Sequence, residues 1–180
     1  MPTGTGVTAD TPVNLVVGAG VILRAHAYLG ATVDNNLFAV EREMFTPDLN
    51  GIMGALKGTD YINSSRGRIE ATVPEVSGAI MAAGIPGAAV DTSTPGMAII
   101  SDATVRRIPD SAYADWELDV PRLNGGQFQF EVDDAINTAP FEGELQDDGL
   151  FAPRYVLEGR RDAASPGTSP WRIRILDTAS

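Results

Sequence analysis

Apolar and polar residues alternate along much of the chain, in short stretches bounded by Gly, Pro, Asn and Asp. Alternation with a period of two places successive side chains on opposite faces of a strand. The expected strands are residues 21–28, 37–44, 68–73, 127–133, 154–158 and 171–175. In the clearest one, Phe128, Phe130 and Val132 share one face. The pattern predicts an all-β fold, a β-sandwich or barrel, in which one face of each sheet is wet.

A single segment has the spacing of a helix. Apolar residues recur every three or four positions between Val76 and Ala83, after Pro74 and before Gly84. Proline fits the first turn of a helix and glycine its end, so one short α-helix is expected over residues 75–83, covering a sheet. A weaker helical pattern lies at residues 112–116.

The remaining segments organise the chain into one domain with an arm. Residues 1–12 are small and polar and are expected to form a flexible N-terminal arm. Residues 13–180 are expected to form the β-sandwich domain, with long loops at 46–67 and 85–96 where Gly and Pro gather.

The negative charge of the chain argues against nucleic acid as a tightly bound partner. The chain carries 24 acids and 13 Lys and Arg, for a net charge of −11, and residues 110–150 hold eleven acids against Arg122 alone. Such a block repels phosphate, which argues against tight nucleic-acid binding; it also suits a solubilising face. No apolar run is long enough to cross a bilayer and the N-terminus does not resemble a secretory signal, so synthesis in the cytoplasm without membrane insertion is expected.

Candidate chemistry is sparse. The chain has no cysteine and one histidine, His26, so neither a thiolate metal site nor a pair of imidazole ligands is available. The acidic pairs at 133–134 and 147–148 do not match a calcium loop, and Leu23 stands where a dinucleotide-binding loop beginning at Gly18 needs a third glycine. No Gly-x-Ser-x-Gly turn is present. We therefore expect no catalytic residue, no metal and no cofactor, and a protein that is not an enzyme.

The order of several segments carries a resemblance to a known family. The segments are Leu29–Thr32, Phe38–Glu43, Lys57–Asp60, Arg68–Val73, Gln127–Asp133, Phe141–Leu145 and Ser169–Ile173. In this order and spacing, over about residues 20–176, the chain resembles the major tail tube protein of long-tailed (siphovirus-type) bacteriophages. No single motif is specific, so the order carries the weight.

The resemblance implies an assembly. Six copies would form a ring around a continuous β-barrel, and rings would stack into a tail tube through which double-stranded DNA passes without specific binding. The implied partners are other copies of the chain, the tape measure protein, the tail terminator and the distal tail and tip proteins, in the virion tail. Alternatives are another tail component, such as a terminator or a contractile-tail-like tube, a head decoration protein, a small-ligand-binding β-barrel with an internal cavity, or a carboxylate hydrolase with a cleft.

Two sets of residues are candidates for such an assembly. The apolar 46–67 region would contact neighbouring subunits or rings, or else cover its own core; the contact candidates are Phe45, Leu49, Ile52, Met53, Leu56 and Lys57. Part of the acidic block would line a DNA-repelling channel, or else lie outside and keep tubes apart; the lumen candidates are Glu117, Asp119, Glu131 and Asp133.

Overall fold

The computed structural model describes residues 19–47, 57–58, 60–75, 77–102, 107–122, 125–142 and 151–177. Its elements are β1 (Val21–Arg24), β2 (Ala27–Ala31), β3 (Val33–Phe45), β4 (Tyr61–Thr72), α1 (Gly78–Gly84), β5 (Ala89–Asp91), β6 (Ile99–Ser101), the 3₁₀ turn η2 (Asp110–Ala112), β7 (Ala114–Pro121), β8 (Gln127–Asn137), β9 (Arg154–Glu158) and β10 (Trp171–Leu176). The predicted all-β fold with one short helix is confirmed.

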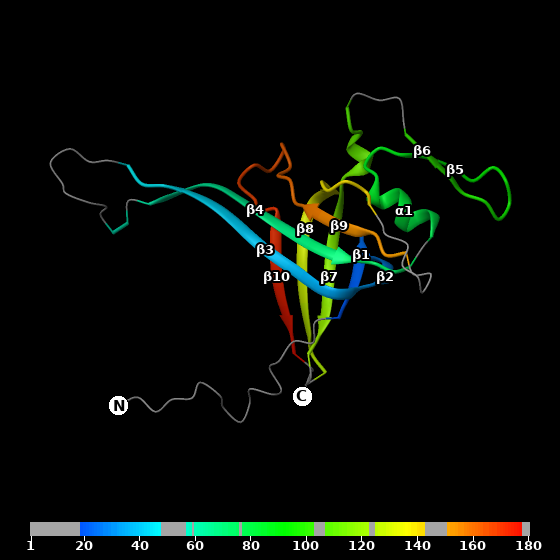
Figure 1. The fold of residues 1–180 in the computed structure, drawn as a ribbon. Coiled ribbons are helices and arrows are strands. Elements are labelled where there is room, and N and C mark those ends of the chain that lie inside the picture. Colours follow the sequence, from blue (N-terminus) through cyan, green and yellow to red (C-terminus); the bar gives the residue numbers. More distant parts are fainter. Residues whose placement is uncertain are drawn as a thin grey trace.

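The main sheet has eight strands and bends on itself at β8. Seven strands follow the order β2-β1-β7-β8-β9-β4-β3, and β10 pairs with the first half of β8. Asp134 has a φ of 47°, and beyond it Ile136 and Asn137 pair with β9 instead of β10. Such an irregularity lets one long strand belong to both layers of a sandwich. Figure 1 shows the result, with β3 and β4 crossing over β7, β8 and β10.

Aromatic side chains fill the space between the two layers. Trp116 and Tyr155 are fully buried with ring centroids 6.1 Å apart, and the Trp116 indole N–H donates to the carbonyl of Ala135 at 3.2 Å. Phe38 of β3 stacks on Phe130 of β8 at 4.8 Å. Aromatic rings bury large apolar areas, so these contacts between layers supply much of the stability of the sandwich.

The helix α1 closes one end of the sandwich. The Ser77 side chain accepts a hydrogen bond from the Ile80 N–H and thereby caps the first turn. The Tyr155 hydroxyl donates to the carbonyl of Ile80 at 2.7 Å, and the Asn137 amide donates to the carbonyl of Gly84 at 2.8 Å. The predicted helix at 75–83 is thus present, and the structure places it at Gly78–Gly84.

Two predictions of local structure are wrong. Residues 21–28 form a hairpin rather than one strand, because Ala25 and His26 adopt φ values of 50° and 62° in a two-residue turn. Such turns usually contain Asn or Gly, so Ala-His carries no turn signal. The weak helix at 112–116 is mostly strand: β7 begins at Ala114 and places Trp116 in the core and Glu117 on the opposite side of the sheet, where it too is buried.

Both predicted long loops contain strands. The 46–67 prediction is wrong from Tyr61 onward, since β4 begins there and pairs with β3 from Tyr61 to Thr72. The 85–96 prediction is wrong at Ala89–Asp91, which pairs with β6 in a separate hairpin. The predicted arm at 1–12 lies outside the described residues.

Candidate functional site

A two-stranded hairpin arm extends away from the sandwich. We define the hairpin arm as Glu41–Phe45 of β3 with Tyr61–Arg66 of β4; these strands remain paired, Phe45 opposite Tyr61 and Glu41 opposite Arg66. Strand β9 pairs with β4 only from Arg68 onward, so no third strand pairs with β4 along the arm. Figure 1 shows β3 and β4 continuing well beyond the other strands. An isolated two-stranded ribbon is marginally stable in water, which favours a partner for it.

The tip of the hairpin arm is apolar and exposed. Met44, Phe45, Tyr61 and Ile62 have exposed fractions of 70%, 59%, 64% and 56%. They come from both strands, Met44 opposite Ile62 and Phe45 opposite Tyr61, so apolar groups occupy both faces of the ribbon. Clustered large apolar side chains on a surface typically mark an interaction site.

The structure describes two of the six predicted contact residues. Phe45 lies at the exposed tip, and Lys57 is exposed in the turn that follows. Residues Leu49, Ile52, Met53 and Leu56 lie outside the described residues. Tyr61 and Ile62 were not among the predicted contact residues; extending the 68–73 strand backward until it paired with Phe45 would have found them.

The four predicted lumen acids share one face of the sheet. Glu117 and Asp119 alternate along β7, Glu131 and Asp133 alternate along β8, and Glu117 lies directly opposite Glu131. All four point away from the core face, which carries Trp116, Leu118 and Val132. The four acids were grouped from the charge of the 110–150 block, and no strand was expected at 114–121, so their common face follows from the sheet and not from the sequence.

Arginines on β10 partly neutralise this acidic face. Arg172 pairs with Glu131 at 3.0 Å and with Asp133 at 2.6 Å, and Arg174 pairs with Glu131 at 2.8 Å. His26, in the β1–β2 turn, contacts Glu117. Burial raises the pKa of Glu131, although the two arginines act in the opposite direction, and burial also raises the pKa of Asp119. Four carboxylates against two guanidinium groups leave the face acidic at neutral pH.

Unpaired strand edges are a further feature of the described sheet. β2 and β3 end the strand path, and β10 pairs only with β8. Along β10, Ile173, Ile175 and Leu176 are exposed by 46%, 58% and 43%. Open edges with exposed apolar side chains are templates for pairing with another chain.

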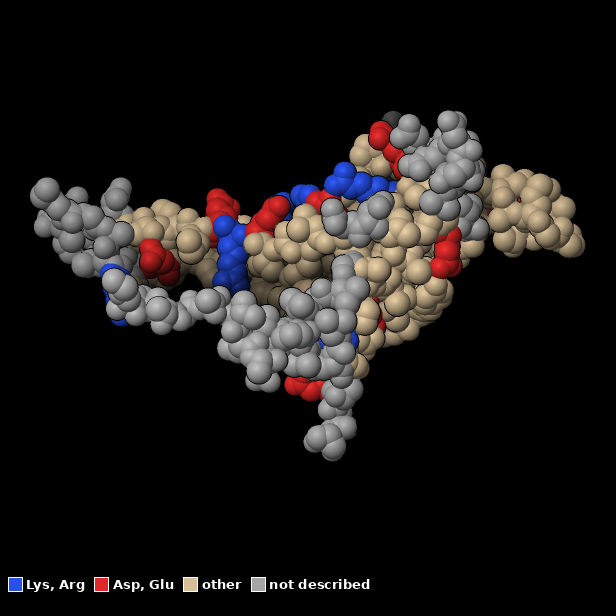
Figure 2. All heavy atoms as spheres, turned by 60° about the horizontal axis from the view of Figure 1, so that its bottom comes forward, with Lys and Arg blue, Asp and Glu red and all other residues tan. Residues whose placement is uncertain are grey.

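A second projecting lobe is almost without charge. Between residues 77 and 101, which include α1 and the β5–β6 hairpin, Asp91 is the only charged residue. Val90, Met97 and Ile99 of this lobe are each nearly half exposed. On the face drawn in Figure 2, acidic and basic residues are interleaved along the arm and body, while the lobe at the right is almost entirely uncharged.

The described residues contain neither a metal-binding cluster nor a membrane-spanning helix. Within the described ranges, no group of three or more His, Asp or Glu side chains is placed to hold a metal ion. Nor does any helix there have the length and apolarity to cross a membrane. No protein-family model matches the chain, and no curated protein matches it.

Proposed function

We propose that this chain is a structural subunit that polymerises, as stacked hexameric rings, into the tail tube of a long-tailed bacteriophage, the conduit for double-stranded DNA. In this proposal the protein acts by assembly and not by catalysis, and its partners are other copies of itself and the neighbouring tail proteins. The family is proposed from the resemblance in segment order. The structural features below support the assembly part.

The hairpin arm is the observation that carries the proposal. The hairpin arm leaves the sandwich and exposes Met44, Phe45, Tyr61 and Ile62 to solvent. In a monomer these apolar side chains lower solubility and do not stabilise the fold. Covered by a neighbouring subunit, the same residues bury apolar area and the ribbon gains its missing strand contacts. The open edges of β2, β3 and β10 offer the sheet-to-sheet joints that a continuous barrel of several copies requires.

The acidic face supports the conduit part of the proposal. Glu117, Asp119, Glu131 and Asp133 lie on the same side of β7 and β8, opposite the core; Glu117 and Glu131 are buried there, and Asp119 and Asp133 are partly exposed. We place this face toward the channel, where surplus negative charge repels the DNA backbone and lets it slide. The competing ligand-barrel function needs an internal cavity, whereas rings of Phe38, Trp116 and Tyr155 occupy the space between the layers.

Self-association of the purified chain tests the proposal. A fully covered aromatic side chain buries about 150–250 Å². Covering the exposed half of Phe45 or Tyr61 then stabilises an interface by roughly 2–3 kcal/mol, or about 30- to 150-fold in association constant. The double variant Phe45→Ser, Tyr61→Ser should remain folded but sediment as monomer at concentrations where the wild type forms large particles.

The matched control is Ile108→Ser, an exposed apolar residue away from the arm. It should assemble as the wild type does. Equal assembly of the arm variant and the control would refute a role for the arm.

A further inference from the structure

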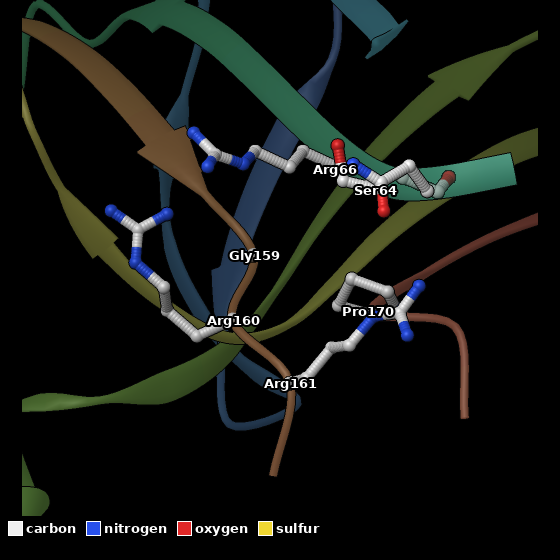
Figure 3. Close-up of a pocket in the computed structure, with 8 residues that line it drawn as sticks. Ser64, Arg66, Gly159, Arg160, Arg161 and Pro170 are labelled. Carbon is white, nitrogen blue, oxygen red and sulfur yellow. The ribbon is translucent and has the colours of Figure 1, made fainter. Parts of the chain in front are cut away.

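A hollow at the base of the hairpin arm gathers three arginines. We call it the arginine hollow; it has a volume of about 390 Å³ and is lined by Asn63, Ser64, Ser65, Arg66, Gly159, Arg160, Arg161 and Pro170. In Figure 3, Arg66 and Arg160 extend to one side of the hollow, from β4 and from the segment after β9, while Arg161 lies at the other side near Pro170. No carboxylate residue lines it.

Two of the three arginines have no carboxylate partner in the described part of the chain. Arg160 pairs with Glu158 at 3.1 Å. Among the described residues, Arg161 donates only to the carbonyl of Pro166, at 2.9 Å, and Arg66 forms no ion pair. Acids lie nearby, since Glu41 is opposite Arg66 on β3 and Asp162 follows Arg161, but neither forms an ion pair with these arginines. Their combined field therefore favours an anion in the hollow.

An open strand edge borders the same hollow. The Gly159 N–H donates to the carbonyl of Gly67 at 3.0 Å, which is the last main-chain contact of the β9 segment with β4. Because alternate residues direct their main-chain groups to the same side, Ser65 presents its N–H and C=O toward the side that β9 has left. An extended peptide can add there as a strand, with its side chains near the arginines.

We infer that the arginine hollow binds an extended acidic segment, residues 142–148, of a second copy of this chain. This inference rests on the proposed assembly, which brings copies together. The free main-chain groups at the edge of β4 favour binding of an extended peptide, and the positive charge of the arginines favours carboxylate side chains on it. Residues 142–148 carry four acids and no base, which makes this run a charge complement to the hollow.

A peptide titration tests the contact without requiring tubes. A labelled peptide of residues 140–149 is titrated with dilute, unassembled protein and followed by fluorescence anisotropy. Binding should weaken as salt rises from about 50 to about 300 mM, because the contact is ionic. Arg66→Glu should weaken binding by about tenfold or more, and Arg161→Glu by a similar factor. Circular dichroism verifies that each variant is folded.

The control variant is Arg154→Glu, which makes the same charge change at an exposed arginine that does not line the hollow. It should bind the peptide as the wild type does. The control peptide replaces its four acids with Gln or Asn and should not bind. Equal binding by wild type and Arg66→Glu, binding of the neutral peptide, or absence of binding at low salt would overturn the inference.

Two further outcomes separate the sources of binding. If inorganic phosphate at the peptide's own concentration displaces the peptide fully, the hollow is a simple oxyanion site and the inference is wrong. If the peptide binds only after the protein's own 142–148 run is neutralised, the contact forms within one copy and the second-copy claim is wrong. Tubes formed by a protein that does not bind the peptide would refute this inference alone; peptide binding without tubes would refute only the proposed function.

Discussion

Replacing Gly67 by alanine should destabilise the joint between the hairpin arm and the sandwich. A Cβ atom built at Gly67 would lie 2.4 Å from the Trp171 Cβ, 2.9 Å from its Cγ and 3.1 Å from the Val132 Cγ1. Carbon atoms pack at about 3.5–4.0 Å, so the strand or the indole must move by about an ångström. Trp171 is held from three sides, by the Phe38 ring, the Arg42 guanidinium and a 3.0 Å hydrogen bond from its indole N–H to Ser65.

The cost should be about 2–3 kcal/mol, at the upper part of the overpacking range, since the indole has little room to yield. For a chain of this length the melting temperature should fall by roughly 4–12 °C. The assay is urea unfolding followed by tryptophan fluorescence. The control is Gly167→Ala, where the added methyl meets nothing within 4 Å. A Gly67→Ala protein as stable as the control would refute the close packing of β4 on Trp171.

Three other perturbations test separate parts of the structure. Trp116→Ala removes a fully buried ring and its hydrogen bond to Ala135, so unfolding free energy should fall by about 3–5 kcal/mol in denaturant titration; a loss below about 1 kcal/mol would contradict its place in the core. Burial raises the pKa of Glu131 above the ordinary value of 4.5, so the folded state holds that proton more tightly than the unfolded chain and stability falls as pH rises through the raised pKa. As the pH is lowered from about 8 to about 4, the unfolding free energy of the wild type should therefore rise relative to that of Glu131→Gln. A fall over the same pH range would show that the arginine pairs outweigh burial. Asn137→Ala removes the side chain that donates to Gly84 and accepts from the Val156 N–H, so it should cost about 1–3 kcal/mol, and an unchanged melting temperature would argue against these bonds.

Local alternation was sufficient where one face of a strand is buried. The strands at 127–133, 154–158 and 171–175 were predicted within a few residues because Phe130, Leu157 and Trp171 face the core and their neighbours do not. The helix was predicted for a similar reason, because apolar residues such as Ile80 recur with helical spacing between Pro74 and Gly84.

Alternation did not predict a strand whose two faces are both exposed to solvent. Residues 61–66 read Tyr-Ile-Asn-Ser-Ser-Arg, a composition typical of a loop, yet they pair with β3 along the arm. Their strand conformation depends on the partner strand and not on burial, so no single-segment pattern contains it. The arginine hollow was unpredictable for a related reason: Arg66 and Arg161 are 95 positions apart and meet only through the register of β4 and β9.

The net charge of the acidic face could not be predicted from the acidic block alone. Charge counting placed Glu117 and Glu131 in one acidic surface, and the sheet does place them side by side. The arginine partners of Glu131 lie about 40 residues further along the chain, on β10, which is brought beside β8 only by the fold. The acidic face is therefore less negative than the sequence block of 110–150 suggested.

Cryo-electron microscopy of the concentrated wild-type protein tests the central claim most directly. The account predicts hollow tubes or rings with six-fold symmetry, with the hairpin arm buried against a neighbouring copy and the β7–β8 acidic face lining the bore. Monomers without rings at every concentration would contradict it, as would an assembly in which the hairpin arm remains exposed to solvent.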